Sequence, residues 1–196
     1  HFGIKPLYWH KSENIFCFCS EIRPLLKSSL IEKKLNPIAI DSYFEFGAIQ
    51  GPETIIENLN SLEAGHYLLI DFNGELIEYK KYWEINFFKK NDLTYDQTIE
   101  KLEVITKTVI QEQLVADAPL GIFLSGGIDS SVLTYFTSLF KKSVNTFTVS
   151  FNNKKFNEGE IAKKTANKFF TNHKEILVSP TILKENISEF INSLDQ

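Results

Sequence analysis

The sequence contains no methionine and no hydrophobic run long enough to cross a membrane. A membrane-spanning helix needs about 18 consecutive apolar residues, and no stretch of this chain approaches that length. A charged and then apolar leader is also missing from its start. We therefore expect no membrane partner and a cytoplasmic location. Because the chain opens on His1 and lacks an initiator methionine, we also expect it to be a fragment of a longer protein.

Cysteine is nearly absent, and its two copies exclude a disulfide framework. Cys17 and Cys19 alternate with aromatic residues in the run IFCFC, residues 15–19. In a β-strand both side chains would point to the same face, and they lie too close along the chain for an ordinary structural disulfide. We expect both to be small buried residues in a protein from a reducing compartment.

The chain also lacks an excess of basic residues. It carries 21 lysines and arginines against 25 aspartates and glutamates, a net charge of −4, and its lysine pairs are scattered. Binding of nucleic acid depends mainly on a basic surface, so we expect no nucleic-acid partner. His10, His66 and His173 are not at the spacing of a zinc site, and zinc is not expected.

The first 85 or so residues are rich in predicted strands and turns. Strands are expected at residues 7–9 and 15–19. Residues 67–79 hold two further β-rich runs around Asn73-Gly74, a pair that favours a two-residue hairpin with a type I′ turn. A helix is expected over residues 37–46, after the Asn36-Pro37 pair. The apolar residues that suggest it are Ile38, Ile40, Tyr43, Phe44 and Phe46. Residues 84–95 lose this periodicity and gain charge, so we place a domain boundary there.

The pattern changes after that boundary. Apolar residues recur at helical spacing over residues 98–115. Runs that favour strands then alternate with runs that favour helices: strand 120–124, helix 130–140, strand 145–151, helix 158–170 and strand 173–178. This alternation predicts a parallel α/β sheet, whose ligands bind at the carboxyl ends of the strands. A chain of 196 residues can hold one large domain of this kind or two small ones.

The sequence LSGGIDSS, residues 124–131, lies at the end of the first of these strands. Gly126 and Gly127 have no side chains and would let a phosphate approach the backbone N–H groups, and a helix beginning near Ile128 would direct its positive end at the same point. A glycine pair by itself is more often a plain turn between strand and helix. The GxxxxGK[ST] and GxGxxG nucleotide motifs are both absent, so the glycines alone leave both hypotheses open.

Four polar residues of the same segment bear on this choice. Ser125, Ser130 and Ser131 would add hydroxyl donors for a phosphate. Asp129 would repel a phosphate unless a magnesium ion lay between them, and it is therefore a candidate metal ligand. The alternative role of Asp129 is to stabilise the first turn of the helix, where acidic residues are favourable.

The complete string resembles the SGGxDS pyrophosphate loop of the ATP pyrophosphatases, which cleave ATP to AMP and pyrophosphate while adenylating an acceptor. Its flanks are similar to those of glutamine-hydrolysing asparagine synthetase. DAPLGIF, residues 117–123, resembles the DVPxGxF segment of that family, and TFTVSF, residues 146–151, resembles its TFSIGF strand. Two departures follow, with Asn157 in place of aspartate in an FDE segment and Lys174 in place of histidine in an HHE segment.

The N-terminal half resembles the class II glutamine amidotransferase domain of the same family. HFGIKPLYW, residues 1–9, is similar to its DRFGIKPLYY run, and SEI, residues 20–22, to its FASEIKAL run. LEAGH, residues 62–66, is similar to LxPGH, and residues 82–83 match the YW pair that closes the domain. The resemblance therefore covers nearly the whole chain in the same order.

The resemblance implies a two-domain fold of the α/β and α+β classes. Residues 1–90 would be the C-terminal part of an Ntn-hydrolase-type αββα amidotransferase domain. Residues 91–196 would be the first half of a Rossmann-like parallel-sheet ATP-pyrophosphatase domain.

The resemblance also implies a reaction. In the family, the aspartate side chain attacks the α-phosphorus of ATP to give β-aspartyl-AMP and pyrophosphate, and ammonia from glutamine then displaces AMP to form asparagine. Aspartate, glutamine and ATP are the implied small-molecule partners, Mg²⁺ is the implied cofactor, and a homodimer is a further expectation. The implied nucleotide-binding residues are Leu124, Ser125, Gly126, Gly127, Asp129, Ser130, Ser131 and Val149. Of these, Leu124 and Val149 would recognise adenine through their backbone, and Asp129 would also hold the metal ion.

No catalytic residue of glutamine hydrolysis is expected within this sequence. The family opens glutamine with an N-terminal cysteine, which would lie upstream, and neither Cys17 nor Cys19 is assigned that role. One alternative function is a related adenylating synthetase, such as a β-lactam synthetase or a peptide- or sugar-modifying amidotransferase. A catalytically inactive binding module is another, but the retained glycine pair and carboxylate argue against it.

Overall fold

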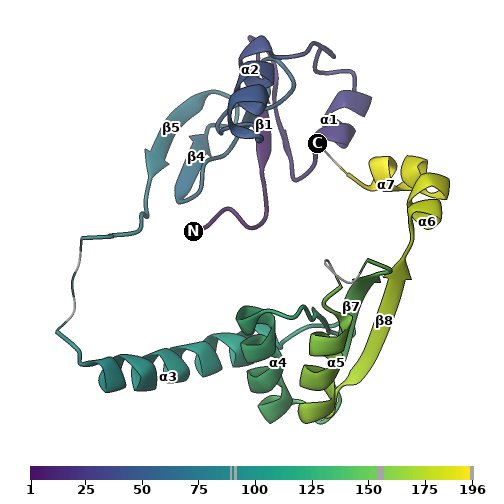
Figure 1. The fold of residues 1–196 in the computed structure, drawn as a ribbon. Helices are drawn as coiled ribbons and strands as arrows, with labels where there is room; N and C mark the ends of the chain where they lie inside the picture. Colours follow the sequence, from purple (N-terminus) through teal and green to yellow (C-terminus); the bar gives the residue numbers. More distant parts are fainter. Residues whose placement is uncertain (89, 91, 154–156, 195–196) are drawn as a thin grey trace. The chain divides into compact units, whose positions relative to one another are not determined.

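A computed structural model describes residues 1–88, 90, 92–153 and 157–194 of the chain (Figure 1). It divides into two compact units. The first comprises His1–Lys90 together with Phe190–Gln196, and the second comprises Asn91–Glu189.

The first unit contains an antiparallel sheet in which β1 (Tyr8–Lys11) lies between β2 (Phe16–Cys19) and β3 (Asn60–Ser61). Both strands predicted here are confirmed, with shifts of one or two residues at their ends. Tyr8 pairs with Cys19 and His10 with Cys17. Both cysteines pack against the hydrophobic core, as the alternation of the sequence predicted.

The core of this unit lies between the sheet and α1 (Ile22–Lys27). Ile22 and Leu25 are three residues apart and therefore share one face of the short helix. Thr54 is the polar member of this region, and its buried hydroxyl is bonded to the carbonyls of Ile56 and Leu59. The buried apolar side chains that form the core cluster are Tyr8, Ile22, Leu25, Ile31, Ile56 and Leu59.

Helix α2 (Pro37–Phe46) has the bounds that the sequence predicted. The Asn36 side chain accepts a hydrogen bond from the Ile38 N–H at 3.0 Å, and proline occupies the first helical position, where its missing N–H costs nothing. Gly47 ends the helix with φ 73°, a left-handed conformation that suits glycine. Only Ala39 of α2 is buried, so the apolar pattern that predicted the helix does not describe a buried stripe.

The hairpin of β4 (His66–Ile70) and β5 (Leu76–Lys81) is confirmed, but its predicted turn is wrong. A type I′ turn needs positive φ at both central residues, whereas of Asn73 and Gly74 only Gly74 has positive φ, at 83°. The Asp71 N–H donates to the Glu75 carbonyl, which leaves a three-residue loop, residues 72–74, between Asp71 and Glu75. Within this loop the Gly74 N–H donates to the Asp71 carbonyl. Asp71 dictates this form, because its carboxylate accepts the N–H groups of Asn73 and Glu75 at 2.9 and 2.8 Å. These bonds hold the pKa of Asp71 below its usual value.

The second unit opens with α3 (Tyr95–Gln113), which starts three residues earlier than predicted. Thr94 and Gln97 form a capping box, in which each side chain accepts the backbone N–H of the other residue. The helix exposes many of its apolar side chains, among them Ile99, Leu102 and Val109.

A parallel sheet follows, with strand order β6 (Gly121–Phe123), β7 (Asn145–Phe151) and β8 (Asn172–Val178). Helices α4 (Ile128–Phe140) and α5 (Gly159–Lys168) connect the strands, and the predicted alternation of strand and helix is confirmed. In Figure 1 both helices lie on one side of the sheet. α4 packs against α3 and β6, and α5 packs against β7 and β8. The parallel sheet and the separate antiparallel sheets confirm the predicted fold class in its coarse form, a mixed α/β chain.

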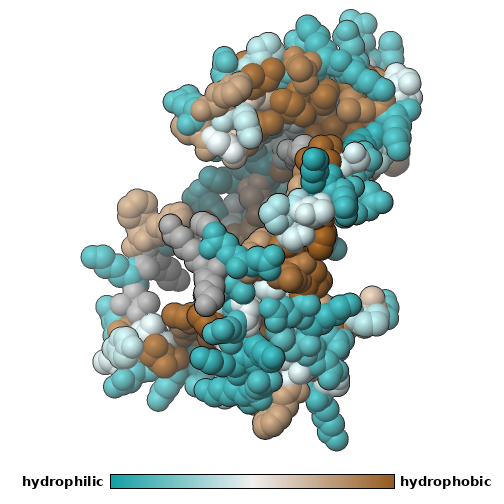
Figure 2. All heavy atoms as spheres, turned by 45° about the vertical axis from the view of Figure 1, so that its right-hand side comes forward, coloured by the Kyte–Doolittle hydropathy of each residue, from teal (hydrophilic) through white to brown (hydrophobic). Residues whose placement is uncertain are grey.

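The two faces of this sheet differ in burial. Along β7, Thr146, Thr148 and Ser150 are buried, whereas the alternate residues Val149 and Phe151 are exposed. Hydrophobic side chains also reach the surface elsewhere in both units (Figure 2). Within the described part of the chain, no helix is both long and apolar enough to span a membrane.

The sequence did not predict the two short helices after β8, α6 (Pro180–Glu185) and α7 (Ile187–Ser193). The start of α6 nevertheless carries a recognisable signal. Ser179 caps it by accepting the Ile182 N–H at 3.2 Å, and Pro180 occupies its first position.

Candidate functional site

The predicted phosphate loop lies at the carboxyl end of β6, the edge of a parallel sheet at which ligands bind. The Leu124 N–H still pairs with the Phe147 carbonyl at 2.8 Å, and α4 begins at Ile128. Gly127 is the N-cap residue of α4 and supplies no side chain to the free N–H groups of its first turn. These groups, together with the helix dipole, can attract an anion.

The serines of the loop already form a hydrogen-bonded network. The hydroxyls of Ser125 and Ser130 share a bond of 2.8 Å, and the Ser130 hydroxyl also accepts the Ser125 N–H at 3.2 Å. The Ser125 hydroxyl accepts the Gly127 N–H at 3.2 Å, and Ser131 donates to the Gly127 carbonyl at 2.8 Å. The three predicted hydroxyls therefore lie together in one turn, where they fix the shape of the loop.

The backbone conformation does not require either glycine of the loop. Neither Gly126 nor Gly127 has positive φ. A Cβ atom on Gly126 would lie 3.4 Å from the Cβ atoms of Glu158 and Ile161, an ordinary contact with the start of α5. A Cβ atom on Gly127 would meet only the Ser125 hydroxyl, at 3.2 Å. Apart from this hydroxyl, which would have to shift by a few tenths of an ångström, and the adjacent residues, no heavy atom lies within 4 Å of that Cβ position in the described part of the chain.

Buried residues support the loop from below. Leu124 is 2% exposed and packs with Ala162 and Ala166 of α5. The hydroxyl of Thr148 donates to the Leu124 carbonyl, which joins the second strand to the start of the loop. Sequence reasoning missed Thr148, although a hydroxyl at a buried strand position is a signal, because it must find a partner inside the protein.

Asp129 and Val149, the remaining predicted site residues, are both exposed. Asp129 lies in the first turn of α4, and Val149 follows Thr148 on β7 with 45% of its surface exposed. The described residues contain no group of three or more histidine, cysteine, aspartate or glutamate side chains that could hold a metal ion. Mg²⁺ in phosphate sites is usually held by one or two carboxylates and the phosphates themselves, and an exposed Asp129 beside the loop fits that role.

Glu158 also contacts the loop, although the sequence did not predict it as a site residue. Its carboxylate accepts the Gly126 N–H at 3.1 Å from the position just before α5. This contact joins residues 32 positions apart in the chain.

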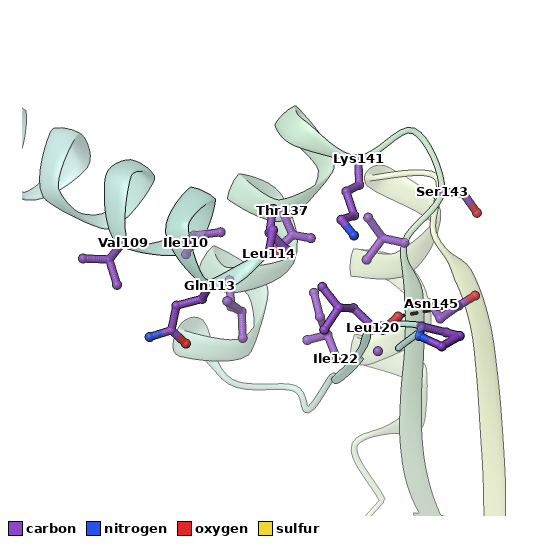
Figure 3. Close-up of a pocket in the computed structure, with 14 residues that line it drawn as sticks. Val109, Ile110, Gln113, Leu114, Leu120, Ile122, Thr137, Lys141, Ser143 and Asn145 are labelled. Atoms are coloured by element: carbon purple, nitrogen blue, oxygen red, sulfur yellow. Dashed lines mark hydrogen bonds between the residues drawn. The ribbon is translucent and has the colours of Figure 1, made fainter. Parts of the chain in front are cut away.

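Two features lie away from the loop. His173 is at the amino end of β8, the opposite edge of the sheet, where its Nδ1 atom is 3.1 Å from the Thr146 hydroxyl. A cavity of about 510 Å³ lies between α3, α4 and the amino ends of β6 and β7. Figure 3 shows it lined by apolar side chains such as Val109, Leu120 and Ile122, with Lys141 beside them. Neither His173 nor this cavity is part of the loop.

The two cysteines both lie on β2. Cys17 and Cys19 are free and partly buried against the first unit's core. Burial raises the pKa of the Cys17 thiol, which disfavours the reactive thiolate.

Family models match both units. The model described as Asparagine synthase matches residues 102–196, and the model described as Glutamine amidotransferase domain matches residues 1–83. The chain belongs to the family of glutamine-hydrolysing asparagine synthetases. The family resemblance found in the sequence is thus confirmed.

Individual relatives agree with the asparagine synthetase family. A Methanocaldococcus jannaschii protein whose name assigns it to these enzymes is 32% identical over 96% of this chain. Asparagine synthetase [glutamine-hydrolyzing] 1 of Bacillus subtilis is 31% identical over 84% of the chain. Amidase chry2 of Gibberella zeae is 27% identical, also over 84%. The chain spans 37%, 26% and 26% of these three relatives, so it corresponds to about a third of their length or less.

Proposed function

We propose that the protein containing this chain makes asparagine from aspartate and ATP, with glutamine as the ammonia donor. The observation that carries the proposal is the SGGIDSS loop at the carboxyl end of β6, within the region matched by the Asparagine synthase model. In this assignment, residues 1–90 form the C-terminal part of an Ntn-hydrolase-type amidotransferase domain. Residues 91–196 form the first half of a Rossmann-like ATP-pyrophosphatase domain.

The loop would bind the β- and γ-phosphates of ATP, which leave as pyrophosphate. The aspartate carboxylate attacks the α-phosphorus, the bond from this phosphorus to the bridging oxygen breaks, and β-aspartyl-AMP forms. The negative charge on the leaving pyrophosphate increases during this step, so donors that are already in position lower the barrier. The N–H groups at the start of α4 are such donors. The hydroxyls of Ser125, Ser130 and Ser131 now bond within the loop, and they would join these donors by rotating toward the phosphate.

Asp129 would hold Mg²⁺ beside the phosphates. When bound, the ion neutralises phosphate charge that a bare carboxylate would otherwise repel. Leu124, which follows β6, and Val149, two residues before the end of β7, would present backbone groups to adenine. The Thr148–Leu124 hydrogen bond supports this arrangement, because it holds the two strands together at that point.

Ammonia from glutamine would then attack the acyl carbon of β-aspartyl-AMP, which releases AMP and forms the amide. This step depends on a glutaminase nucleophile that we propose lies outside the present sequence. The match of residues 1–83 to the glutamine amidotransferase model supports glutamine as the source of ammonia.

The test is ATP–pyrophosphate exchange in the full-length protein, with and without L-aspartate. Exchange that requires aspartate is the expected result. The absence of exchange with any carboxylate would contradict the assignment of the loop.

A related adenylating synthetase is the second candidate. The resemblance to Amidase chry2 favours keeping it, because that relative has a different name yet aligns with most of this chain. Exchange that depends on a carboxylate other than aspartate would support this candidate over asparagine synthesis.

A further inference from the structure

The phosphate loop already carries an anionic group of the protein. The Glu158 carboxylate accepts the Gly126 N–H at 3.1 Å. This N–H belongs to the glycine pair that the proposed function assigns to pyrophosphate. A backbone N–H has one proton to donate, so in this geometry it cannot make a full hydrogen bond to a phosphate oxygen at the same time.

The packing of α5 explains why this particular glutamate reaches the loop. Ala162 is fully buried and packs against Leu124, the residue that precedes the loop. Glu158 lies one helical turn before Ala162, and its carbonyl accepts the Ala162 N–H at 3.0 Å. The small alanine lets α5 approach closely, and the same approach brings Glu158 to Gly126, two residues after Leu124.

The turn before α5 fixes the direction of Glu158. The Asn157 side chain accepts the Gly159 N–H at 2.9 Å, which closes a local turn around Glu158. The corresponding FDE segment of the asparagine synthetase family has aspartate at this position, and asparagine offers the same acceptor oxygen without the charge. Glu175 of β8 lies against Gly159 on the other side, where a Cβ atom on Gly159 would be 2.6 Å from its carboxylate. The start of α5 is therefore constrained by β8 and by a local turn.

We infer that Glu158 is a built-in competitor for pyrophosphate, whose carboxylate occupies the Gly126 N–H until the phosphate displaces it. This inference rests on the proposed function, since it requires the loop to bind phosphate. Two anions cannot share the amide, because repulsion adds to the competition for a single proton. Glu158 is exposed, so it can swing into solvent without a large cost of desolvation or unpacking.

The expected effect is a weakened affinity of the wild-type loop for phosphate. The apparent Kd of a ligand rises in inverse proportion to the fraction of protein in the competent state. An exposed, charge-assisted hydrogen bond is modest in strength. We therefore expect that removing the competitor lowers the Kd for pyrophosphate by roughly three- to tenfold.

The experiment measures the Kd of inorganic pyrophosphate by titration calorimetry on the full-length protein, at constant pH and ionic strength. Glu158→Gln removes the charge, and Glu158→Asp keeps the charge but withdraws it by one methylene. Glu160→Gln is the matched control, because it removes the same charge from the first turn of the same helix. Both Glu158 variants are expected to bind pyrophosphate more tightly than wild type, while Glu160→Gln changes the Kd less than twofold.

A gain of affinity separates competition from a structural role, because a damaged loop would bind more weakly. Wild-type binding with unchanged or weaker binding by Glu158→Gln would overturn the inference and leave the proposed function standing. Equal tightening by Glu158→Gln and Glu160→Gln would also overturn it, because the effect would then be one of net charge. Failure of wild type and all variants to bind pyrophosphate would instead overturn the proposed function of the loop.

Discussion

Replacing Gly127 with alanine separates the two possible reasons for a glycine in the phosphate loop. Gly127 has φ −83°, which alanine adopts without strain, and an added Cβ would contact only the Ser125 hydroxyl, at 3.2 Å. If glycine served only the turn, the substitution would be nearly silent. If a phosphate approaches the backbone here, the methyl group would occupy the space that a phosphate oxygen needs.

The expected change in stability is small because two effects oppose each other. Alanine is a poorer N-cap than glycine, which costs about 0.5–1 kcal/mol. Alanine also reduces the conformational entropy of the unfolded chain, which stabilises by about 0.4–1 kcal/mol where φ is compatible. We therefore expect a melting temperature within a few degrees of wild type.

The expected change in activity is larger. Steric overlap of a methyl group in a close-fitting site costs about 1–3 kcal/mol, which corresponds to a loss of roughly 5- to 150-fold in affinity. The assay is ATP–pyrophosphate exchange in the full-length protein, together with calorimetric melting. Ser138→Ala is the control, because it changes a residue of the same helix outside the loop, whose hydroxyl bonds to the Tyr135 carbonyl. Normal exchange by Gly127→Ala, or an equal loss in Ser138→Ala, would refute this reasoning.

Three further predictions concern the metal ligand, a required glycine and the effect of high pH. Asp129→Asn should abolish ATP–pyrophosphate exchange while the release of glutamate from glutamine continues, and normal exchange would exclude Asp129 as the metal ligand. Gly65→Ala should destabilise the protein by about 2–5 kcal/mol in calorimetric melting, because Gly65 has φ 70° and a Cβ atom would overlap the Trp83 carbonyl oxygen. This overlap would disturb the hydrogen bonds from the Tyr82 and Trp83 N–H groups to the Gly65 carbonyl. An unchanged melting temperature would contradict this prediction. Burial, followed by the hydrogen bond to Glu63, raises the pKa of Tyr79 to about 12 from an ordinary value of 10. Between pH 10 and 12 the unfolded chain loses this proton while the folded chain keeps it, so the free energy of unfolding should fall as the pH rises. Tyr79→Phe should show a shallower fall in denaturant titrations over that range, and an identical slope would show that Tyr79 does not contribute.

Much of the second unit was predictable because its signals are local. The alternation of strand and helix over residues 120–178 depends on spacing within short windows. The bounds of α2 were predictable for the same reason, since Asn36, Pro37 and Gly47 act on their own neighbours. The phosphate loop could be recognised because all but one of the predicted site residues lie within residues 124–131.

Other features depended on competition between local signals or on packing. Asn73-Gly74 favours a type I′ turn, but the Asp71 carboxylate binds two backbone N–H groups and selects a three-residue loop. The apolar residues of α2 helped to predict the helix but not its burial. Only Ala39 of α2 is buried, because burial depends on what the fold places against the helix.

The sequence by itself determined the family, the order of strands and helices in the second unit, and the segment that forms the candidate site. The tertiary structure decided which groups meet at that site. Thr148 reaches the Leu124 carbonyl across 24 residues, and Glu158 reaches the Gly126 N–H across 32. Neither contact follows from a local pattern, because both depend on how β7 and α5 pack against the end of β6.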